Sequence, residues 1–212
     1  MRKVGNYFKN ISLIYGINMK NKIVLNIKEL EKLFGCKILK NIVSLGLDTA
    51  TKTGYAIATT DNKEVKISTG FINVDVKGIT DKYERNRMRY EAVFSNLKGL
   101  IKKEQRVVIE NVYYGRNPNT LIVLSRIGAI AWTLAKLKDC KVIKWRTANQ
   151  ARSLIGVKGN VKKPIVVEMV NGILGTDIKN DDIIDAIVLA LNGIMDKEPK
   201  VTVKKKKVRR KK

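Results

Sequence analysis

The chain has 212 residues, 44% of them hydrophobic, which is enough to bury the core of one domain with extensions. Lys and Arg number 43 against 19 Asp and Glu, and this net charge of +24 favours a polyanionic partner, nucleic acid before an anionic membrane surface. With no histidine and only two cysteines, Ser-His and Cys-His catalysis are excluded and a zinc site is disfavoured.

Residues 1–40 are predicted to form an extension ahead of the main body. Within it, the segment KIVLN is typical of a short strand, and Ile27 to Phe34 (IKELEKLF) of a short amphipathic helix ended by Gly35. The basic start lacks an uninterrupted apolar stretch and a small-residue cleavage signal, and no apolar run approaches the length of a membrane span. We therefore expect no secretory leader and no membrane association.

Residues 41–196 form the predicted main body, in which three consecutive strands precede an alternation of helices and strands. The expected strands are 42–48, 54–60, 64–74, 106–110 and 140–145, and the expected helices are 80–103, 117–138, 147–155, 164–174 and 181–195. This order predicts an α/β fold with a mixed five-stranded sheet and helices on both faces. It is the element order of the ribonuclease-H-like architecture.

Residues 197–212 are predicted to be a basic, disordered tail. Every position from Lys204 to Lys212 except Val208 is basic, so this stretch carries +8 of the total charge of +24 and leaves +16 on the rest. We expect the tail to bind phosphates and the body itself to be basic as well.

Four acidic residues stand out because of where the predicted elements place them. Asp48 and Glu110 each close an apolar strand, where side chains emerge at a sheet edge, and Asp182 and Asp185 lie on one face of the first turn of an apolar helix. Each has a simpler alternative by itself. Asp182 could cap the helix, Asp185 could suit the positive helix end, and Asp48 could order a turn.

The joint pattern of the four carboxylates favours a metal site. Carboxylates held close together raise one another's pKa unless cations offset their charge. In a chain without histidine, the natural offset is a hard divalent cation bound by oxygen, Mg²⁺ or Mn²⁺. Two such ions roughly 4 Å apart form the clamp used for attack of water on a phosphodiester. The sequence therefore predicts a nuclease in which basic surface collects phosphates and an acidic pocket collects metal.

Four motifs, in order and spacing, resemble the RuvC family of Holliday-junction resolvases. They are LGLDTATKTGYAI, VVIENVYYGRNPNT, VKGNVKKPIVVEMV and DDIIDAIVLAL, and the likeness runs from about Val43 to Met195. The resemblance implies a ribonuclease-H-like fold, a homodimer, and paired magnesium-dependent nicks in two strands of a four-way DNA junction. The chain departs from the family in its extension, its basic tail and its first loop, DTATKTG, which lacks the usual Pro and early Gly.

By position, the resemblance implies that Asp48, Glu110, Asp182 and Asp185 are the catalytic metal ligands, here called the acidic tetrad. Asp181 precedes the helical pair and could be mistaken for its first member. Lys163 matches a family lysine near the active site, which would touch the scissile phosphate.

Further matched or neighbouring residues are expected to contact DNA. Tyr113 matches an aromatic position beside the acidic Glu, and its ring would either stack on an unpaired base or pack in the core. The other expected DNA contacts are Arg116, Asn117, Asn119, Arg152, Lys158 and Lys162.

The helix from Asn117 carries an apolar stripe that core packing largely explains, made of Leu121, Leu124, Gly128, Ala131, Trp132 and Ala135. The resemblance implies that its adjacent small-residue face also pairs with a two-fold mate.

Three functions remain open from the sequence. The first is a structure-selective endonuclease of four-way junctions in the cytoplasm of a bacterial cell, of chromosomal or phage origin. The second is a nuclease of the same fold that acts on flaps, forks or RNA–DNA hybrids, since phosphate contacts carry no sequence information. The third is a junction-binding protein without catalysis, which the presence of all four carboxylates disfavours.

Overall fold

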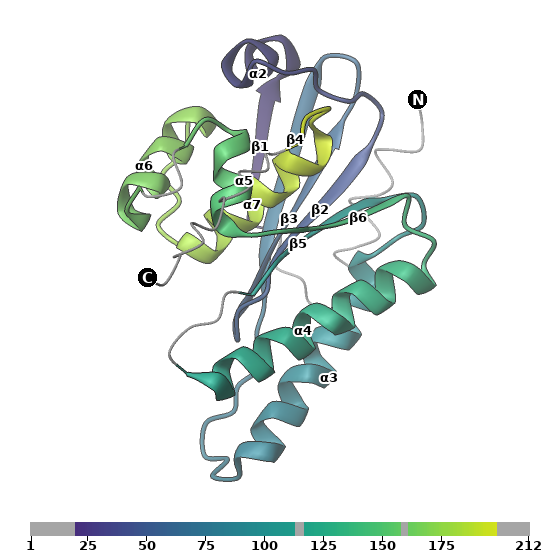
Figure 1. Ribbon diagram of the computed structural model, residues 1–212, viewed down its shortest axis with the longest axis vertical. Coiled ribbons are helices and arrows are strands. Elements are labelled where there is room, and N and C mark those ends of the chain that lie inside the picture. The colour runs from purple at the N-terminus through teal and green to yellow at the C-terminus, as the bar shows by residue number, and fades with distance from the viewer. Residues whose placement is uncertain (1–19, 113–116, 158–160, 199–212) are drawn as a thin grey trace, which may run out of the picture.

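The computed structural model describes residues 20–112, 117–157 and 161–198. Its centre is a six-stranded sheet with the strand order β1-β4-β3-β2-β5-β6 (Figure 1). The strands are β1 (Lys20–Asn26), β2 (Val43–Asp48), β3 (Thr53–Thr60), β4 (Glu64–Ile72), β5 (Arg106–Glu110) and β6 (Val142–Arg146). The pairs β1–β4, β4–β3 and β3–β2 are antiparallel, whereas β5 and β6 run parallel to β2. The predicted mixed sheet is confirmed, with six strands in place of five.

Helices cover both faces of this sheet, as predicted (Figure 1). On one face lie α3 (Lys82–Leu100) and α4 (Pro118–Leu137), and on the other α5 (Ala148–Leu154), α6 (Lys163–Leu174) and α7 (Asp181–Ile194). Each side has its own cluster of buried apolar side chains, so the sheet separates two cores.

The alternation of side chains along β2 decides where Asp48 points. Leu45 and Leu47 belong to the core beneath α3 and α4. Gly46 instead faces α7, because a Cβ built on it would lie 2.2 Å from the carbonyl oxygen of Ala186. Since successive side chains of a strand point to opposite faces, Asp48 lies on the α7 side with Gly46.

Helix α7 packs unusually close to the sheet, and three glycines permit this. Besides Gly46, Gly54 of β3 would place a Cβ 2.5 Å from the carbonyl oxygen of Asp182. On the helix itself, a Cβ on Gly193 would lie 1.8 Å from the hydroxyl of Ser44. Every residue from Ile183 to Ile194 is buried. The helix is therefore enclosed along its length, and only its first turn reaches the sheet edge.

Both ends of α7 are fixed by hydrogen bonds. The side chain of Asn180 caps the first turn by accepting from the backbone N–H of Ile183 at 3.1 Å. The cap is therefore Asn180, and Asp182, which the sequence also allows as a cap, lies inside the first turn. At the other end, the N–H of Leu39 donates to the carbonyl of Ile194 at 2.8 Å, and the N–H of Asp196 donates to the carbonyl of Lys37 at 2.9 Å.

The sixth strand comes from the N-terminal extension. β1 pairs with β4, and the helix α2 (Ile27–Phe34) follows it directly. As predicted, α2 ends at Gly35, which adopts φ of 59° in the left-handed region. Ile27, Leu30 and Phe34 are buried in the same core as α7. Residues 20–40 therefore belong to the sheet and its packing.

Helix α4 differs from α7 in how much of its apolar surface is covered. Of the helices in the described ranges, α4 alone is long and apolar enough to span a membrane, which corrects the expectation that no apolar run approaches that length. A core helix of a soluble protein passes the same test. Here α4 packs along α3 and β5 with Ile127, Ala131 and Ala135 buried. Its other side leaves Ile122 and Trp132 exposed.

The two cysteines are free, as expected. Cys36 and Cys140 are both half-buried, and burial raises the pKa of each thiol. Neither lies in the acidic site described below.

Candidate active site

Two neighbouring parallel strands bring the first two acids together. Asp48 ends β2 and Glu110 ends β5, and the preceding residues Leu47 and Ile109 are register partners. Because β2 and β5 are parallel, both carboxyl groups emerge at the same sheet edge. A protonated Asp48 can donate a hydrogen bond to Glu110, and Asp48 is only 5% exposed. Thr49, next in the chain, donates its hydroxyl to the carbonyl oxygen of Glu110 at 3.3 Å and ties the strand ends together.

The first turn of α7 supplies the other two acids. Asp182 and Asp185 are three residues apart and therefore share a face of the helix. Gly54, which is the register partner of Asp48 in β3, lies against the backbone of Asp182. A side chain at position 54 would separate the helix from the strand end. Gly54 thus sets the approach of Asp182 to Asp48.

The electrostatics of Asp48 show that all four acids act on one another. Burial contributes most, followed by a hydrogen bond that protonated Asp48 donates to Glu110 and by the charges of Glu110, Asp185 and Asp182; together they raise the pKa of Asp48 to about 10. Burial and the charge of Asp181 also raise the pKa of Asp182, against the opposing charges of Lys163 and Lys52. The four acids, predicted from three distant segments, therefore lie near enough in the fold for the charges of the other three to act on Asp48.

Lys163 begins α6 beside this cluster. Its ammonium lies 2.7 Å from a carboxylate oxygen of Asp181 and 3.7 Å from one of Asp185. Burial lowers the pKa of Lys163, but the hydrogen bond to Asp181 and the charges of Asp185, Asp181 and Asp48 outweigh it, so the net pKa is raised. Asp181 pairs outward with Lys163, which also lowers the Asp181 pKa against the effect of burial. The two adjacent acids thus have different partners, and Asp182 is the one that faces inward.

Arg152 contacts an acid of the tetrad directly. From α5, its guanidinium donates to both oxygens of Asp185, with Nη2 at 2.8 Å from Oδ1 and 3.0 Å from Oδ2. The side chains of both residues are 11% exposed. The sequence pattern groups Arg152 with the DNA contacts and gives no signal for this pairing.

The remaining expected DNA contacts fall into two groups. Lys162 is exposed at the start of α6, and Asn117 caps α4 by accepting from the N–H groups of Asn119 and Thr120 at 3.0 and 3.4 Å. Tyr113, Arg116 and Lys158 lie outside the described residues.

Sequence reasoning missed the roles of Gly54 and Lys52. Lys52 follows Asp48 in the loop between β2 and β3, lies 4.1 Å above the ring of Phe71, and acts on the charge of Asp182. The signal that could have revealed both residues is their position inside the first motif.

The tetrad fits a hard divalent cation by the chemistry of its donors. All four groups are carboxylates, and a cation would relieve the burial and repulsion that raise the Asp48 pKa. Within the described ranges, no three acidic or cysteine side chains are already arranged as a metal cage. In this arrangement a protonated Asp48 can donate to Glu110, and Asp185 bonds to Arg152.

Comparisons with known proteins agree on one family. The family described as crossover junction endodeoxyribonuclease RuvC matches residues 44–193. The chain is 26% identical to the protein of that name from Brachyspira hyodysenteriae, over 71% of this chain and 92% of the relative. It is 32% identical to that from Chlamydia abortus, over 69% and 90%.

Solved structures show the same fold. Thermus thermophilus RuvC superposes with a TM-score of 0.56 at 16% identity, covering 74% of this chain and 99% of that one. The same Thermus protein in complex with a Holliday junction substrate gives a TM-score of 0.54 at 19% identity. The ribonuclease-H-like mixed sheet predicted from the sequence is confirmed by these neighbours.

Proposed function

The chain belongs to the RuvC family of crossover junction endodeoxyribonucleases, and we propose that its acidic tetrad hydrolyses phosphodiesters in two strands of a four-way DNA junction. The protein is a nuclease of Holliday junctions, and family membership makes it metal-dependent. Our proposal assigns that chemistry to particular residues.

One observation carries the assignment. The pKa of Asp48 is raised to about 10 by burial and by three other carboxylates that come from β5 and α7. Burying several carboxylates near one another costs free energy unless a cation offsets their charge, so their presence at a sheet edge in a chain of net charge +24 supports a metal-binding role.

The tetrad would hold two Mg²⁺ ions per site, with Mn²⁺ as a substitute. Bound there, the ions would activate water and stabilise the charge on the leaving oxygen. Carboxylate oxygens from two strand ends and one helical turn supply ligands from three directions. The rigid packing of α7 through Gly46 and Gly54 would keep those directions fixed.

The basic residues around the tetrad would position the DNA. Lys163 carries a raised pKa and stays protonated at neutral pH, so its ammonium can bind the phosphate that is cut. Lys52 and Lys162 lie on the loop after Asp48 and at the start of α6, where they can contact neighbouring phosphates. We also assign Asn117, Tyr113, Arg116 and Lys158 to the DNA surface, on the strength of their motif positions.

Two sites related by a two-fold axis would suit two symmetric cuts, and we propose a homodimer formed through α4. Ile122 is 48% exposed, Trp132 42% and Leu137 73%, which is unusual for one apolar helix. Gly128, a member of the predicted core stripe, is turned inward against the Trp145 ring. The exposed side of α4, from Ile122 through Trp132 to Leu137, is therefore the face that would pair. As a DNA enzyme of a bacterial family, the protein would work in the cytoplasm.

Cleavage of a synthetic four-way junction with Mg²⁺ tests the assignment. Wild-type protein should make paired, symmetric nicks. Asp48→Asn should cut at least ~10³-fold more slowly, because metal-assisted charge stabilisation contributes several kcal/mol to the transition state.

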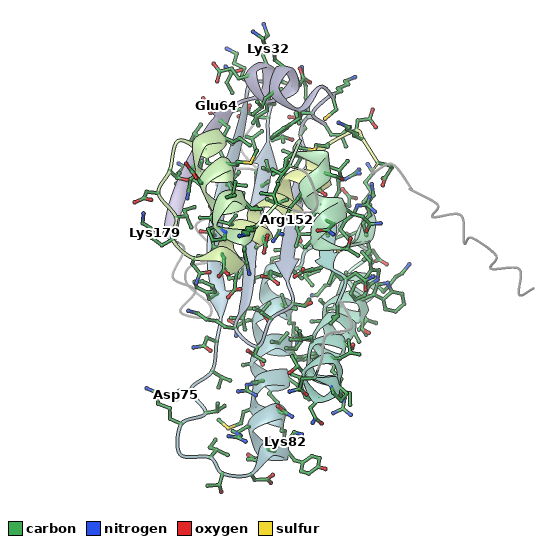
Figure 2. All side chains as sticks on the ribbon, turned by 60° about the vertical axis from the view of Figure 1, so that its left-hand side comes forward. Lys32, Glu64, Asp75, Lys82, Arg152 and Lys179 are labelled. Atoms are coloured by element: carbon green, nitrogen blue, oxygen red, sulfur yellow. The ribbon has the colours of Figure 1, made fainter. Side chains whose placement is uncertain are left out.

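Asp75→Asn is the matched control. Asp75 lies near the start of α3, far from Arg152, which contacts Asp185 of the tetrad (Figure 2). Its carboxylate accepts a hydrogen bond from the N–H of Lys77 at 2.9 Å, a local turn contact. Undiminished cleavage by Asp48→Asn would show that the tetrad does not catalyse the reaction. Stronger cleavage of a flap or an RNA–DNA hybrid than of a junction would show that the four-way junction is not the preferred substrate.

A further inference from the structure

The pairing of Arg152 with Asp185 has the geometry of a fork. Nη2 donates to both carboxylate oxygens at 2.8 and 3.0 Å, and Nε donates to Oδ1 at 3.3 Å. A guanidinium held in this way is more specific than a point charge, because its planar donors match both oxygens at once. With both side chains 11% exposed, water competes little for either group.

The element that carries Arg152 is anchored to α7 itself. Helix α5 begins with a reciprocal capping box between Thr147 and Gln150. The side-chain amide of Asn192 on α7 donates to the carbonyl of Ala151 at 3.1 Å, and Ala151 and Leu154 are buried in the core. The backbone of Arg152 is therefore held in place, and only its side chain is free to change partner.

The fork commits the oxygens that a metal ion would need. A divalent cation at Asp185 would compete for the same lone pairs and would repel the guanidinium that holds them. The other close cation, Lys163, is 3.7 Å from Asp185 and has Asp181 as its nearer partner at 2.7 Å. Arg152 is thus the main occupant of Asp185 in this arrangement.

We propose that Arg152 is a latch: it holds Asp185 in the metal-free protein and must release it when metal binds, and the freed guanidinium then takes a phosphate of the junction. The inference rests on the proposed function, since it takes Asp185 as a metal ligand. It makes Arg152 a positioning residue for the site. The fork that fits a carboxylate also fits a phosphate, so the same side chain can neutralise Asp185 in one state and DNA in the other.

Such an exchange couples metal binding to DNA binding. Metal displaces Arg152 and so adds a cation for the junction, while a phosphate that draws Arg152 away frees Asp185 for metal. By linkage, each ligand must strengthen the other by the same factor. Loading of the site would then be favoured on the correct substrate.

Mn²⁺ binding to the free protein, measured by calorimetry, tests the latch without any cleavage. Arg152→Gln should bind Mn²⁺ about 10-fold more tightly than wild type, which corresponds to about 1.4 kcal/mol. Arg152→Lys keeps the charge but cannot form the fork, and it too should bind more tightly than wild type. Arg87→Gln is the control, because Arg87 pairs with Glu84 and Glu91 on the exposed side of α3.

Two results would overturn the latch. One is an Arg152→Gln protein, folded by its thermal melt, with unchanged or weaker Mn²⁺ binding, which would make the pair purely structural. The other is Arg152→Lys binding Mn²⁺ like wild type while Arg152→Gln binds more tightly, which would reduce the effect to net charge.

Junction affinity by fluorescence anisotropy tests the second half of the exchange. In EDTA, where Asp185 holds Arg152, Arg152→Gln should change the dissociation constant less than threefold. In Ca²⁺, which takes oxygen ligands, the same variant should bind the junction about 10-fold more weakly than wild type. An equal loss in both buffers would mean that Arg152 contacts DNA regardless of metal, and the exchange would be wrong.

The two proposals fail in different ways. If Asp48→Asn binds Mn²⁺ as well as wild type does, the tetrad is not the metal site and the proposed function falls first. If Asp48→Asn loses Mn²⁺ while Arg152→Gln gains nothing, the tetrad stands and the latch alone is wrong.

Discussion

Two apolar helices of the protein, α7 and α4, lie on opposite faces of the same sheet and differ in how much of their surface is covered. α7 is buried from Ile183 to Ile194, whereas α4 leaves Ile122, Trp132 and Leu137 exposed. A helix enclosed by packing can hold acids at its first turn in one geometry, which a metal site requires. A helix that is open along one side is suited to a partner. Apolar composition alone therefore does not reveal which task a helix has.

We expect the largest effect from a substitution at Gly46, where the backbone of α7 packs close to β2. Gly46→Ala would place a Cβ 2.2 Å from the carbonyl oxygen of Ala186 and 2.3 Å from the N–H nitrogen of Ala190, both in the backbone of α7. Because backbone cannot move aside cheaply, we expect the free energy of unfolding to fall by at least ~2 kcal/mol, with loss of cleavage in the protein that remains folded.

Chemical denaturation measures this effect against a matched glycine. Gly172 lies within α6, and a Cβ built on it meets nothing within 4 Å. Gly172→Ala should be neutral or stabilise the protein by up to ~1 kcal/mol, because Ala favours helix. Equal stability of the two variants would show that α7 does not sit as close to β2 as described.

A substitution on the exposed side of α4 should have the opposite effect: it should weaken association between subunits and leave the fold intact. Trp132→Glu places a charge on the exposed side of α4, where the native ring is 42% exposed. We expect a change in unfolding free energy of less than ~1 kcal/mol but dissociation of the proposed dimer to monomers, measured by light scattering. Thr133→Glu, on the next exposed position, tests how far the pairing face extends. A Trp132→Glu protein that stays dimeric would remove α4 from the interface.

The smallest effect concerns the charge beyond α7. Deleting Lys204 to Lys212 removes +8 of charge, and these residues lie outside the part of the chain that the structure describes. Junction binding should weaken, and the slope of log affinity against log salt should become shallower by about 0.9 for each phosphate that the tail neutralises. The position of the nicks should not move. A shifted cut would mean that the tail, and not the enclosed helix, selects the scissile bond.

Much of the site could be predicted because it depends on local periodicity. Asp48 and Glu110 close apolar strands, and strands in an open α/β sheet deliver their last side chains to one edge. The spacing of Asp182 and Asp185 fixes a shared helix face irrespective of the rest of the fold. The order of the five expected strands then brings the three segments together.

What the sequence could not reveal depends on interactions between distant segments. The segment KIVLN joins the sheet only because it pairs with β4. The alternating pattern of β4 predicts one exposed face, but most residues of β4 are buried. Gly54 matters only because α7 lies against it, and Arg152 reaches Asp185 only because α5 packs against α7. The sequence also could not identify Asn180 as the cap of α7, because three neighbouring polar side chains all suit that role.

The main-chain bonds between residues 37–39 and the last turn of α7 have a mechanical consequence. The hydrogen bond from Leu39 to Ile194 ties the last turn of α7 to the segment after α2, while Asn180 caps the first turn by a bond within the helix. This tie and the close contacts at Gly46 and Gly54 would oppose movement of α7 along or around its axis, so the length of the helix sets where Asp182 and Asp185 lie. Adding or removing one residue between Asp185 and Ile194 would rotate Asp182 and Asp185 by about 100° around the helix axis. Two of the four carboxylates would then point away from Asp48 and Glu110. Residues 37–39, which follow the N-terminal strand and helix, would thereby help to position the acids of α7.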